Sequence, residues 1–111
     1  MRTLLLLRGA PGAGKSIWIK ENHLEQYTIE ADAFRQLISN PVLTEDGTFA
    51  ISQANDHMAW SLLFTALENR MKRGDFTIVD ATHSSENMFR KYKALAEKYR
   101  YKIYYKQFDI S

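Results

Sequence analysis

The segment that most constrains the fold is an apolar run that ends in a glycine-rich stretch. The run covers residues 3–7 and is followed by Gly9-Ala10-Pro11-Gly12-Ala13-Gly14, which cannot be helical throughout. A continuous apolar run of this length is typical of a strand buried on both faces of a parallel sheet. Residues 15–22 are then compatible with a helix. The order of strand, glycine loop and helix predicts the first unit of a parallel α/β sheet.

The rest of the chain continues this alternation of strands and helices. We expect three further strands at residues 26–30, 76–80 and 101–108, and three further helices at residues 33–39, 51–73 and from about residue 84 to 99. Parallel strands require right-handed crossovers, which place helices on both faces of the sheet. The sequence therefore predicts an α/β fold with three layers, a parallel sheet of about four strands, and one domain over residues 1–111.

Apolar periodicity predicts which helix faces are buried. In the long helix the expected stripe is Ile51, Ala54, Met58, Leu62 and Thr65, widened by Leu63, Ala66, Leu67 and Met71. Trp60 and Phe64, one turn apart, are expected in the core rather than in a base-stacking platform. Ser84 and Glu86 favour the start of the last helix. The apolar stripe expected in that helix is Met88, Tyr92, Leu95 and Tyr99.

The glycine loop has the spacing of a complete Walker A sequence, Gly9-x-x-x-x-Gly14-Lys15-Ser16. Glycines let successive backbone N–H groups curl around a phosphate chain, and the N-terminus of the next helix adds partial positive charge. Lys15 can bridge the β- and γ-phosphates, and the Ser16 hydroxyl can ligate Mg²⁺. We expect residues 9–16 to bind ATP with Mg²⁺ in a fold of the P-loop NTPase type; the alternative is a glycine-rich turn with an incidental lysine.

Carboxylates follow two of the expected strands, at the edge where ligands of parallel sheets bind. Asp80 ends the third strand and fits a Mg²⁺-supporting position, although an aspartate there can also cap a turn. Asp32 and Arg35, three residues apart at a helix start, share one face. Asp32 could remove a proton from an attacking hydroxyl while Arg35 neutralises phosphate charge. The alternative is an N-cap with a local salt bridge.

Composition excludes several other classes of protein. The chain has no cysteine, which excludes a disulfide scaffold, a cysteine zinc site and thiol catalysis. No apolar run approaches the ~20 residues of a membrane span, so we expect a cytoplasmic protein without membrane contact. Residues 87–111 carry seven basic and two acidic side chains. Such a run can attract a polyanion, but it is more often a solvated helix face.

Four segments of the chain carry a family resemblance. They resemble the kinase domain of bacteriophage and bacterial polynucleotide 5′-kinases. The four segments are residues 9–18, Tyr27-Thr28-Ile29-Glu30-Ala31-Asp32-Ala33-Phe34-Arg35-Gln36, Val79-Asp80-Ala81-Thr82 and Phe108-Asp109. The resemblance covers nearly the whole chain. It implies an ATP- and Mg²⁺-dependent kinase that acts on 5′-OH ends of RNA or DNA in nucleic-acid repair.

The resemblance also implies roles for individual residues. Lys15 and Ser16 would hold the ATP phosphates and Mg²⁺, and Asp32 would be the general base for the 5′-hydroxyl. Arg35 would contact the acceptor phosphate, and Asp80 would support the metal and the arginine. The sequence departs from the family at Ala31, where some relatives have a basic residue, and at His83, where many have asparagine.

A further departure is the helical lid that supplies an arginine to the donor phosphates in the family. This sequence stops at Ser111 and looks like a kinase domain cut before that lid, which predicts weak activity and self-association through an unpaired sheet edge. Two other functions stay open: a P-loop kinase for a small-molecule alcohol or a nucleotide, and a non-catalytic ATP-binding module.

Overall fold

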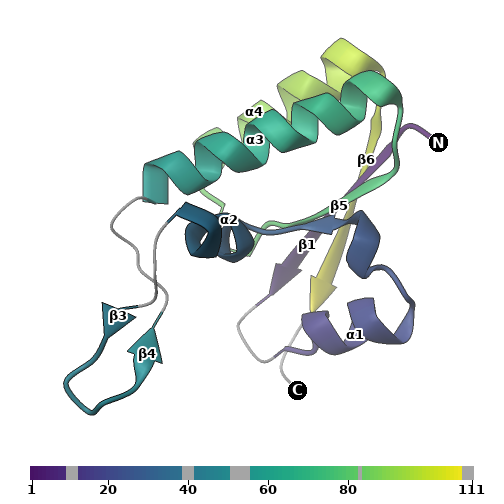
Figure 1. Ribbon diagram of the computed structural model, residues 1–111. Helices are drawn as coiled ribbons and strands as arrows, with labels where there is room; N and C mark the ends of the chain where they lie inside the picture. The colour runs from purple at the N-terminus through teal and green to yellow at the C-terminus, as the bar shows by residue number, and fades with distance from the viewer. Residues whose placement is uncertain (10–12, 39–41, 51–55, 83, 109–111) are drawn as a thin grey trace.

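The computed structural model describes residues 1–9, 13–38, 42–50, 56–82 and 84–108. Its elements follow one another in the expected alternation (Figure 1). They are β1 (Thr3–Gly9), α1 (Lys15–Glu21), a short 3-10 helix (Glu25–Tyr27), β2 (Thr28–Ile29), α2 (Ala31–Ile38), β3 (Val42–Leu43), β4 (Phe49–Ala50), α3 (Asp56–Arg73), β5 (Thr77–Asp80), α4 (Glu86–Tyr99) and β6 (Lys102–Phe108).

The main sheet has four parallel strands in the order β2-β5-β1-β6, which confirms the predicted sheet. The first strand lies between two neighbours, and its Leu4, Leu6 and Leu7 have no exposed surface, as expected of a strand buried on both faces. In Figure 1, α3 and α4 cover one face of the sheet and α1 covers the other, so the structure has three layers. The carboxyl ends of the strands meet at the edge where α1 and α2 begin.

The core lies between the sheet and the helices α3 and α4. Side chains from β1, β5 and both helices form one buried cluster, which includes Leu4, Val79, Leu63, Leu67 and Tyr92. On the opposite face, Trp18 of α1 packs edge-on against Phe108 of β6, with ring centroids 5.7 Å apart. Burial of apolar surface in these layers holds the strands in fixed positions.

The predicted stripe of α3 was wrong. Met58 and Leu62 are 52% and 37% exposed, and the buried face consists of Ala59, Trp60, Leu63, Leu67 and Met71. Adjacent apolar residues at 62 and 63 support two stripes that differ by one position, and packing against the sheet decides between them. The widening residues Leu63, Leu67 and Met71 and the core position of Trp60 are confirmed. Ile51 and Ala54 lie outside the described residues.

Other elements differ from their predicted bounds. The strand expected at 26–30 has only two residues, because the 3-10 helix replaces its first part. Asp32 lies inside the first turn of α2 rather than capping it. Ser85, not Ser84, caps α4, because the Ser85 Oγ accepts a hydrogen bond from the Met88 N–H at 3.3 Å. A two-stranded hairpin, β3 and β4, extends away from the sheet and was not predicted (Figure 1).

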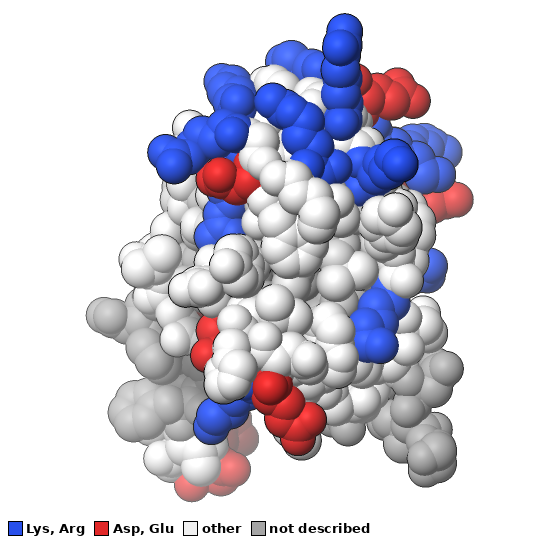
Figure 2. Space-filling view, turned by 90° about the vertical axis from the view of Figure 1, so that its right-hand side faces the viewer, with Lys and Arg blue, Asp and Glu red and all other residues white. Residues whose placement is uncertain are grey.

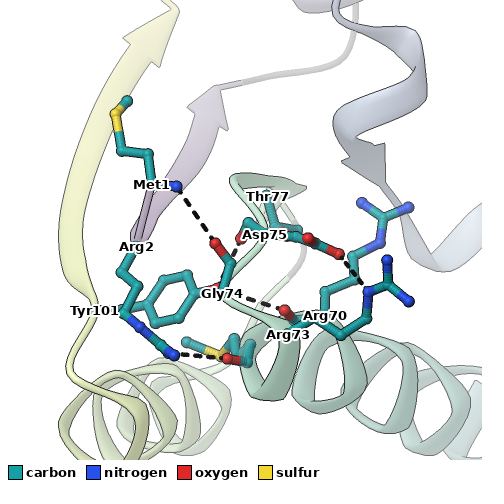
Figure 3. A network of polar contacts seen from close by, with 9 residues as sticks. Met1, Arg2, Arg70, Arg73, Gly74, Asp75, Thr77 and Tyr101 are labelled. Carbon is teal, nitrogen blue, oxygen red and sulfur yellow. Dashed lines mark hydrogen bonds and ion pairs between the residues drawn. The ribbon is translucent and has the colours of Figure 1, made fainter.

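At the amino ends of the strands, polar contacts join the sheet to the ends of α3 and α4 (Figure 3). The Arg2 Nη1 donates to the carbonyl oxygens of Met71 and Tyr99 at 3.1 and 2.9 Å, close to the C-terminal ends of α3 and α4. The Tyr101 hydroxyl donates to the Asp75 carbonyl at 2.8 Å. Terminal helix carbonyls lack partners within the helix, so these donors complete both helix ends.

Candidate active site

The two glycines that bound the Walker A loop, Gly9 and Gly14, both have a positive φ, which favours glycine. Gly9 has φ of 147°, and a Cβ atom there would lie 2.3 Å from the Phe108 carbonyl oxygen, so only glycine fits. Gly14 has φ of 93° and leads into α1. Ala13 is described as a bend, whereas Ala10, Pro11 and Gly12 lie outside the described residues. The predicted order of strand, glycine loop and helix is confirmed.

Lys15, the first residue of α1, points back across the sheet edge. Its side chain is 9% exposed, and its Nζ donates to the Gly9 carbonyl at 3.1 Å and to the Thr82 hydroxyl. The same Nζ lies 3.4 Å from Oδ1 of Asp80. These partners fix the ammonium group beside the loop. Ser16 follows it at the start of α1 and is exposed to solvent.

Asp80 ends β5 beside β1 and is held in a defined orientation. Its Oδ1 accepts hydrogen bonds from the Thr82 N–H at 3.1 Å and from the Thr82 hydroxyl at 2.6 Å. Register pairs Asp80 with Leu7, two residues before the loop. The structure thus brings Lys15, Asp80 and Thr82 together, while His83 lies outside the described residues.

Arg35 is clamped between two carboxylates. Its side chain is 7% exposed, its Nη1 pairs with Oδ1 of Asp32, and its Nε donates to Oδ1 of Asp56 at 2.6 Å. A further ion pair joins its Nη2 to the same Asp56 oxygen. Burial alone would lower the pKa of Arg35, but the hydrogen bonds that it donates to Asp56 and Asp32, together with their negative charges, outweigh burial and raise that pKa. The guanidinium is therefore a permanently charged, fixed group.

Like Asp56, whose side chain is 45% exposed, Asp32 is an accessible member of this clamp. Its side chain is 48% exposed, whereas the Arg35 side chain is 7% exposed, so one carboxylate oxygen is anchored on an arginine that solvent hardly reaches. Their separation by three residues on α2 brings them together, as the spacing predicted. A carboxylate held in this way and open to solvent can accept a proton from a bound hydroxyl.

Glu30 is a third carboxylate at the same edge. It follows Ile29 of β2, which pairs with Val79, so Glu30 and Asp80 leave neighbouring strands at the same level. Partial burial, and then the charges of Asp80 and Asp32, raise the pKa of Glu30, while Lys15 opposes this rise. A small cavity of about 20 Å³ is lined by Glu30, Ala31, Asp32, Arg35, Trp60 and Asp80.

A larger, mainly apolar hollow opens next to Glu30, between α1 and α2. Its volume is about 330 Å³, and Ser16 and Glu30 line it on the side of the phosphate loop. Phe34 and Leu37 of α2 and Ile19 of α1 supply much of its apolar wall. The hollow has the size and mixed lining of a site for a small organic group.

Sequence reasoning missed three contributors to this site. Thr82 and Glu30 stand at the carboxyl ends of strands, and that position was the signal that could have singled them out. Asp56 was not found, because it lies 21 residues from Arg35 and no local spacing connects the two. Within the described ranges, no set of three or more His, Asp or Glu side chains is arranged to hold a metal ion. No helix in those ranges is long and apolar enough to cross a membrane.

Comparisons with known proteins identify a family and similar folds. Residues 4–111 match the family described as AAA domain. A chain of the Pnkp1/Rnl/Hen1 complex is 22% identical with a TM-score of 0.71, and a chain of the Pnkp1/Rnl/Hen1 RNA repair complex is 23% identical with a TM-score of 0.70. Each match covers 98% of this chain but only 36% and 33% of those chains.

A third similar structure is the APS kinase CysC of Mycobacterium tuberculosis, at 15% identity and a TM-score of 0.61. That match covers 96% of this chain and 75% of the kinase. No curated protein sequence matches the chain. At these identities the solved structures establish the fold, which is that of nucleotide-binding P-loop kinases. The chain therefore belongs to the AAA domain family and has a P-loop kinase fold.

Proposed function

We propose that this chain is the kinase domain of a polynucleotide 5′-hydroxyl kinase, which transfers the γ-phosphate of ATP to 5′-OH ends of RNA or DNA in nucleic-acid repair. The observation that carries the proposal is the clamp of Asp32, Arg35 and Asp56. It presents an accessible carboxylate and a buried arginine at the same sheet edge as Lys15 and Asp80. Structural similarity to a chain of an RNA repair complex supports the choice of acceptor.

The phosphate loop would bind the donor nucleotide. Residues 9–16, apart from Pro11, would supply backbone N–H groups to the phosphates, and Lys15 would exchange its contacts with Gly9 and Thr82 for the β- and γ-phosphates. The loop glycines leave room for the phosphates to approach the backbone.

Ser16 and Asp80 would hold the magnesium ion in this proposal. Mg²⁺ prefers oxygen ligands and is usually held by one or two protein oxygens together with substrate phosphates and water, so a cluster of three protein ligands is not required. The Ser16 hydroxyl at the start of α1 and the Asp80 carboxylate at the end of β5 are oxygen donors of this kind. When bound, the ion would neutralise charge on the transferring phosphates.

Asp32 and Arg35 would act on the acceptor. The 5′-oxygen attacks the γ-phosphorus, the bond from that phosphorus to the β-bridging oxygen breaks, ADP leaves, and Asp32 takes the hydroxyl proton. Arg35 holds Asp32 in place, and its charge would attract the acceptor phosphate. Positioning and charge neutralisation account for most of the catalysis in such transfers.

A second candidate is a kinase that phosphorylates a small-molecule alcohol. The hollow of about 330 Å³ between α1 and α2 favours it, because its volume suits a small acceptor and Ser16 lies in its lining. Similarity of the fold to APS kinase is compatible with either acceptor. A module that binds ATP without transferring phosphate is the third alternative.

An acceptor panel tests the proposal. The protein at its full natural length is incubated with labelled ATP, Mg²⁺ and one of three acceptors: a 5′-OH oligonucleotide, the same oligonucleotide with a 5′-phosphate and a free 3′-OH, or a mixture of nucleosides and sugars. We expect label on the 5′-OH oligonucleotide alone. Transfer to the small alcohols alone would establish the second candidate, and ATP binding without any transfer would establish the third.

A further inference from the structure

Positive charge gathers at one end of the molecule, far from the candidate active site. Figure 2 shows Lys and Arg side chains crowded at the top of the view, where Figure 1 places the C-terminal ends of α3 and α4. The basic residues of this end are Arg2, Arg70, Lys72, Arg73, Lys98, Arg100 and Lys102, and its acidic ones are Glu68, Asp75 and Glu97. This end is therefore strongly basic.

Internal contacts explain only part of this charge. Arg2 serves the two helix ends, Arg73 pairs with Asp75 at 3.1 Å, and Lys98 pairs with Glu68 at 3.3 Å. Lys72, Arg100 and Lys102 are exposed, and none of them forms an ion pair within the part of the chain that the structure describes. Their charge is open to a ligand.

Arg100 lies at a position where the backbone conformation favours glycine. It ends α4 in the left-handed conformation, with φ of 59° and ψ of 45°. Glycine adopts this conformation without steric cost and is the usual residue at such helix ends, whereas a residue with a Cβ atom is disfavoured there. An arginine at this position places an exposed cation in the turn that leads into β6.

An exposed aromatic ring lies beside this charge. Side chains alternate between the faces of β6, so Lys102, Tyr104 and Lys106 share one face at intervals of about 6.6 Å, twice the rise of about 3.3 Å per residue. Tyr104 is 54% exposed, whereas Tyr101 is 8% exposed and belongs to the core. The Lys106 ammonium lies over the rings of Trp18 and Phe108, where α1 covers this face. The end of the face near Lys102 is the open one.

We propose that Arg100, Lys102 and Tyr104 form a docking surface for single-stranded nucleic acid. Cations next to an exposed aromatic ring are the usual elements of such surfaces, because the cations meet phosphates and the ring stacks on a base. Two stacked nucleotides, at about 3.4 Å each, match the step from Lys102 to Tyr104. An acidic protein would use the cations but would have no base to stack on Tyr104.

This surface is distinct from the proposed kinase site. It lies at the amino ends of the strands, and Lys15 and Asp32 lie at the carboxyl ends. Binding at this surface needs neither ATP nor a 5′-hydroxyl. The proposal therefore stands or fails independently of the kinase reaction.

Fluorescence anisotropy tests the surface directly. The probes are a 20-nucleotide single-stranded RNA and DNA with a dye on the 5′ end, which leaves no 5′-hydroxyl, and a dye-labelled polyglutamate; ATP and Mg²⁺ are omitted. The variants are Arg100→Gly, Lys102→Gln, Tyr104→Ala and Tyr104→Phe. Lys93→Gln is the matched control, because Lys93 is exposed and belongs to the middle of α4 rather than to the turn into β6.

We expect Tyr104→Ala to weaken binding of the oligonucleotides about 5- to 150-fold, the range for one base stacked on an aromatic ring, and Tyr104→Phe and Lys93→Gln to leave it unchanged. Arg100→Gly and Lys102→Gln should each reduce the salt slope of binding by about 0.7. Arg100→Gly should also raise the melting temperature, which separates lost binding from lost folding.

Three results would overturn the proposal. The first is unchanged oligonucleotide affinity in both Arg100→Gly and Tyr104→Ala. The second is polyglutamate binding as tight as that of the oligonucleotides and insensitive to Tyr104, which would assign the surface to an acidic protein. The third is an equal loss in Lys93→Gln, which would mean that only net charge matters.

Discussion

Replacing Asp56 by asparagine removes one of the two carboxylates that hold Arg35. A hydrogen bond to a charged group is worth about 1.5–3 kcal/mol, and the Arg35 side chain is 7% exposed while that of Asp56 is 45% exposed. Because water can reach Asp56, we discount this range and expect a loss of about 1–2 kcal/mol in the free energy of unfolding. For a domain of this size that loss lowers the melting temperature by about 4–10 °C.

The chain contains a matched control for this variant. Asp75 is also 45% exposed and also pairs with an arginine, but its partner Arg73 is 70% exposed. Asp75→Asn should therefore change the free energy of unfolding by less than about 0.5 kcal/mol. The comparison isolates the burial of the arginine, which is the property that gives the clamp its strength.

A double-mutant cycle with Arg35→Met completes the measurement. Asp56 is the first residue of α3, where a negative charge also stabilises the helix dipole by about 0.3–1 kcal/mol. In the Arg35→Met background only that smaller contribution of Asp56 should remain, so the cycle separates it from the clamp. Thermal melts of Asp56→Asn and Asp75→Asn that shift equally, or a coupling energy near zero with Arg35, would refute the clamp.

Two further predictions concern the site. Lys15→Ala should weaken ATP binding on the order of tenfold or more by calorimetry, because it removes a charged phosphate contact. Lys20→Ala, in the same helix, is the control and should leave ATP affinity unchanged. Equal ATP affinity in the two variants would contradict the assignment of Lys15 to the phosphates. Partial burial and neighbouring carboxylates raise the pKa of Glu30. The folded protein therefore holds the Glu30 proton more tightly than the unfolded chain does. The stability gained in this way is complete below the ordinary glutamate pKa of about 4.3 and is lost as pH rises through the raised pKa. Glu30→Gln should therefore unfold at higher urea concentration than the parent at pH 7, and this difference should shrink by pH 4; a difference independent of pH would contradict the raised pKa.

The parts of the fold that follow from local pattern could be predicted from the sequence. The positions of the four strands of the main sheet, the glycine loop and the pairing of Asp32 with Arg35 each depend on residues close together in the chain. Gly9 shows why the pattern works: its place in the motif coincides with a backbone contact that admits no Cβ atom.

The remaining features depend on contacts between distant segments. Asp56 reaches Arg35 only because α3 packs beside α2, and no local spacing encodes that contact. The buried face of α3 shifted by one position because Leu62 and Leu63 are equally apolar, and only packing on the sheet distinguishes them. The hairpin of β3 and β4 was missed because each strand has only two residues, too few for an alternating pattern.

The most direct test of the proposed function is single-turnover transfer of labelled γ-phosphate from ATP to a 5′-OH oligonucleotide, measured with the full-length protein and its Asp32→Asn variant. Asparagine keeps the shape of Asp32 but cannot accept the proton. The rate should fall by about 10²–10⁴ while calorimetric ATP affinity stays unchanged. Transfer by Asp32→Asn at the rate of the parent protein would contradict the role of Asp32 as the general base and, with it, the reaction proposed for this site.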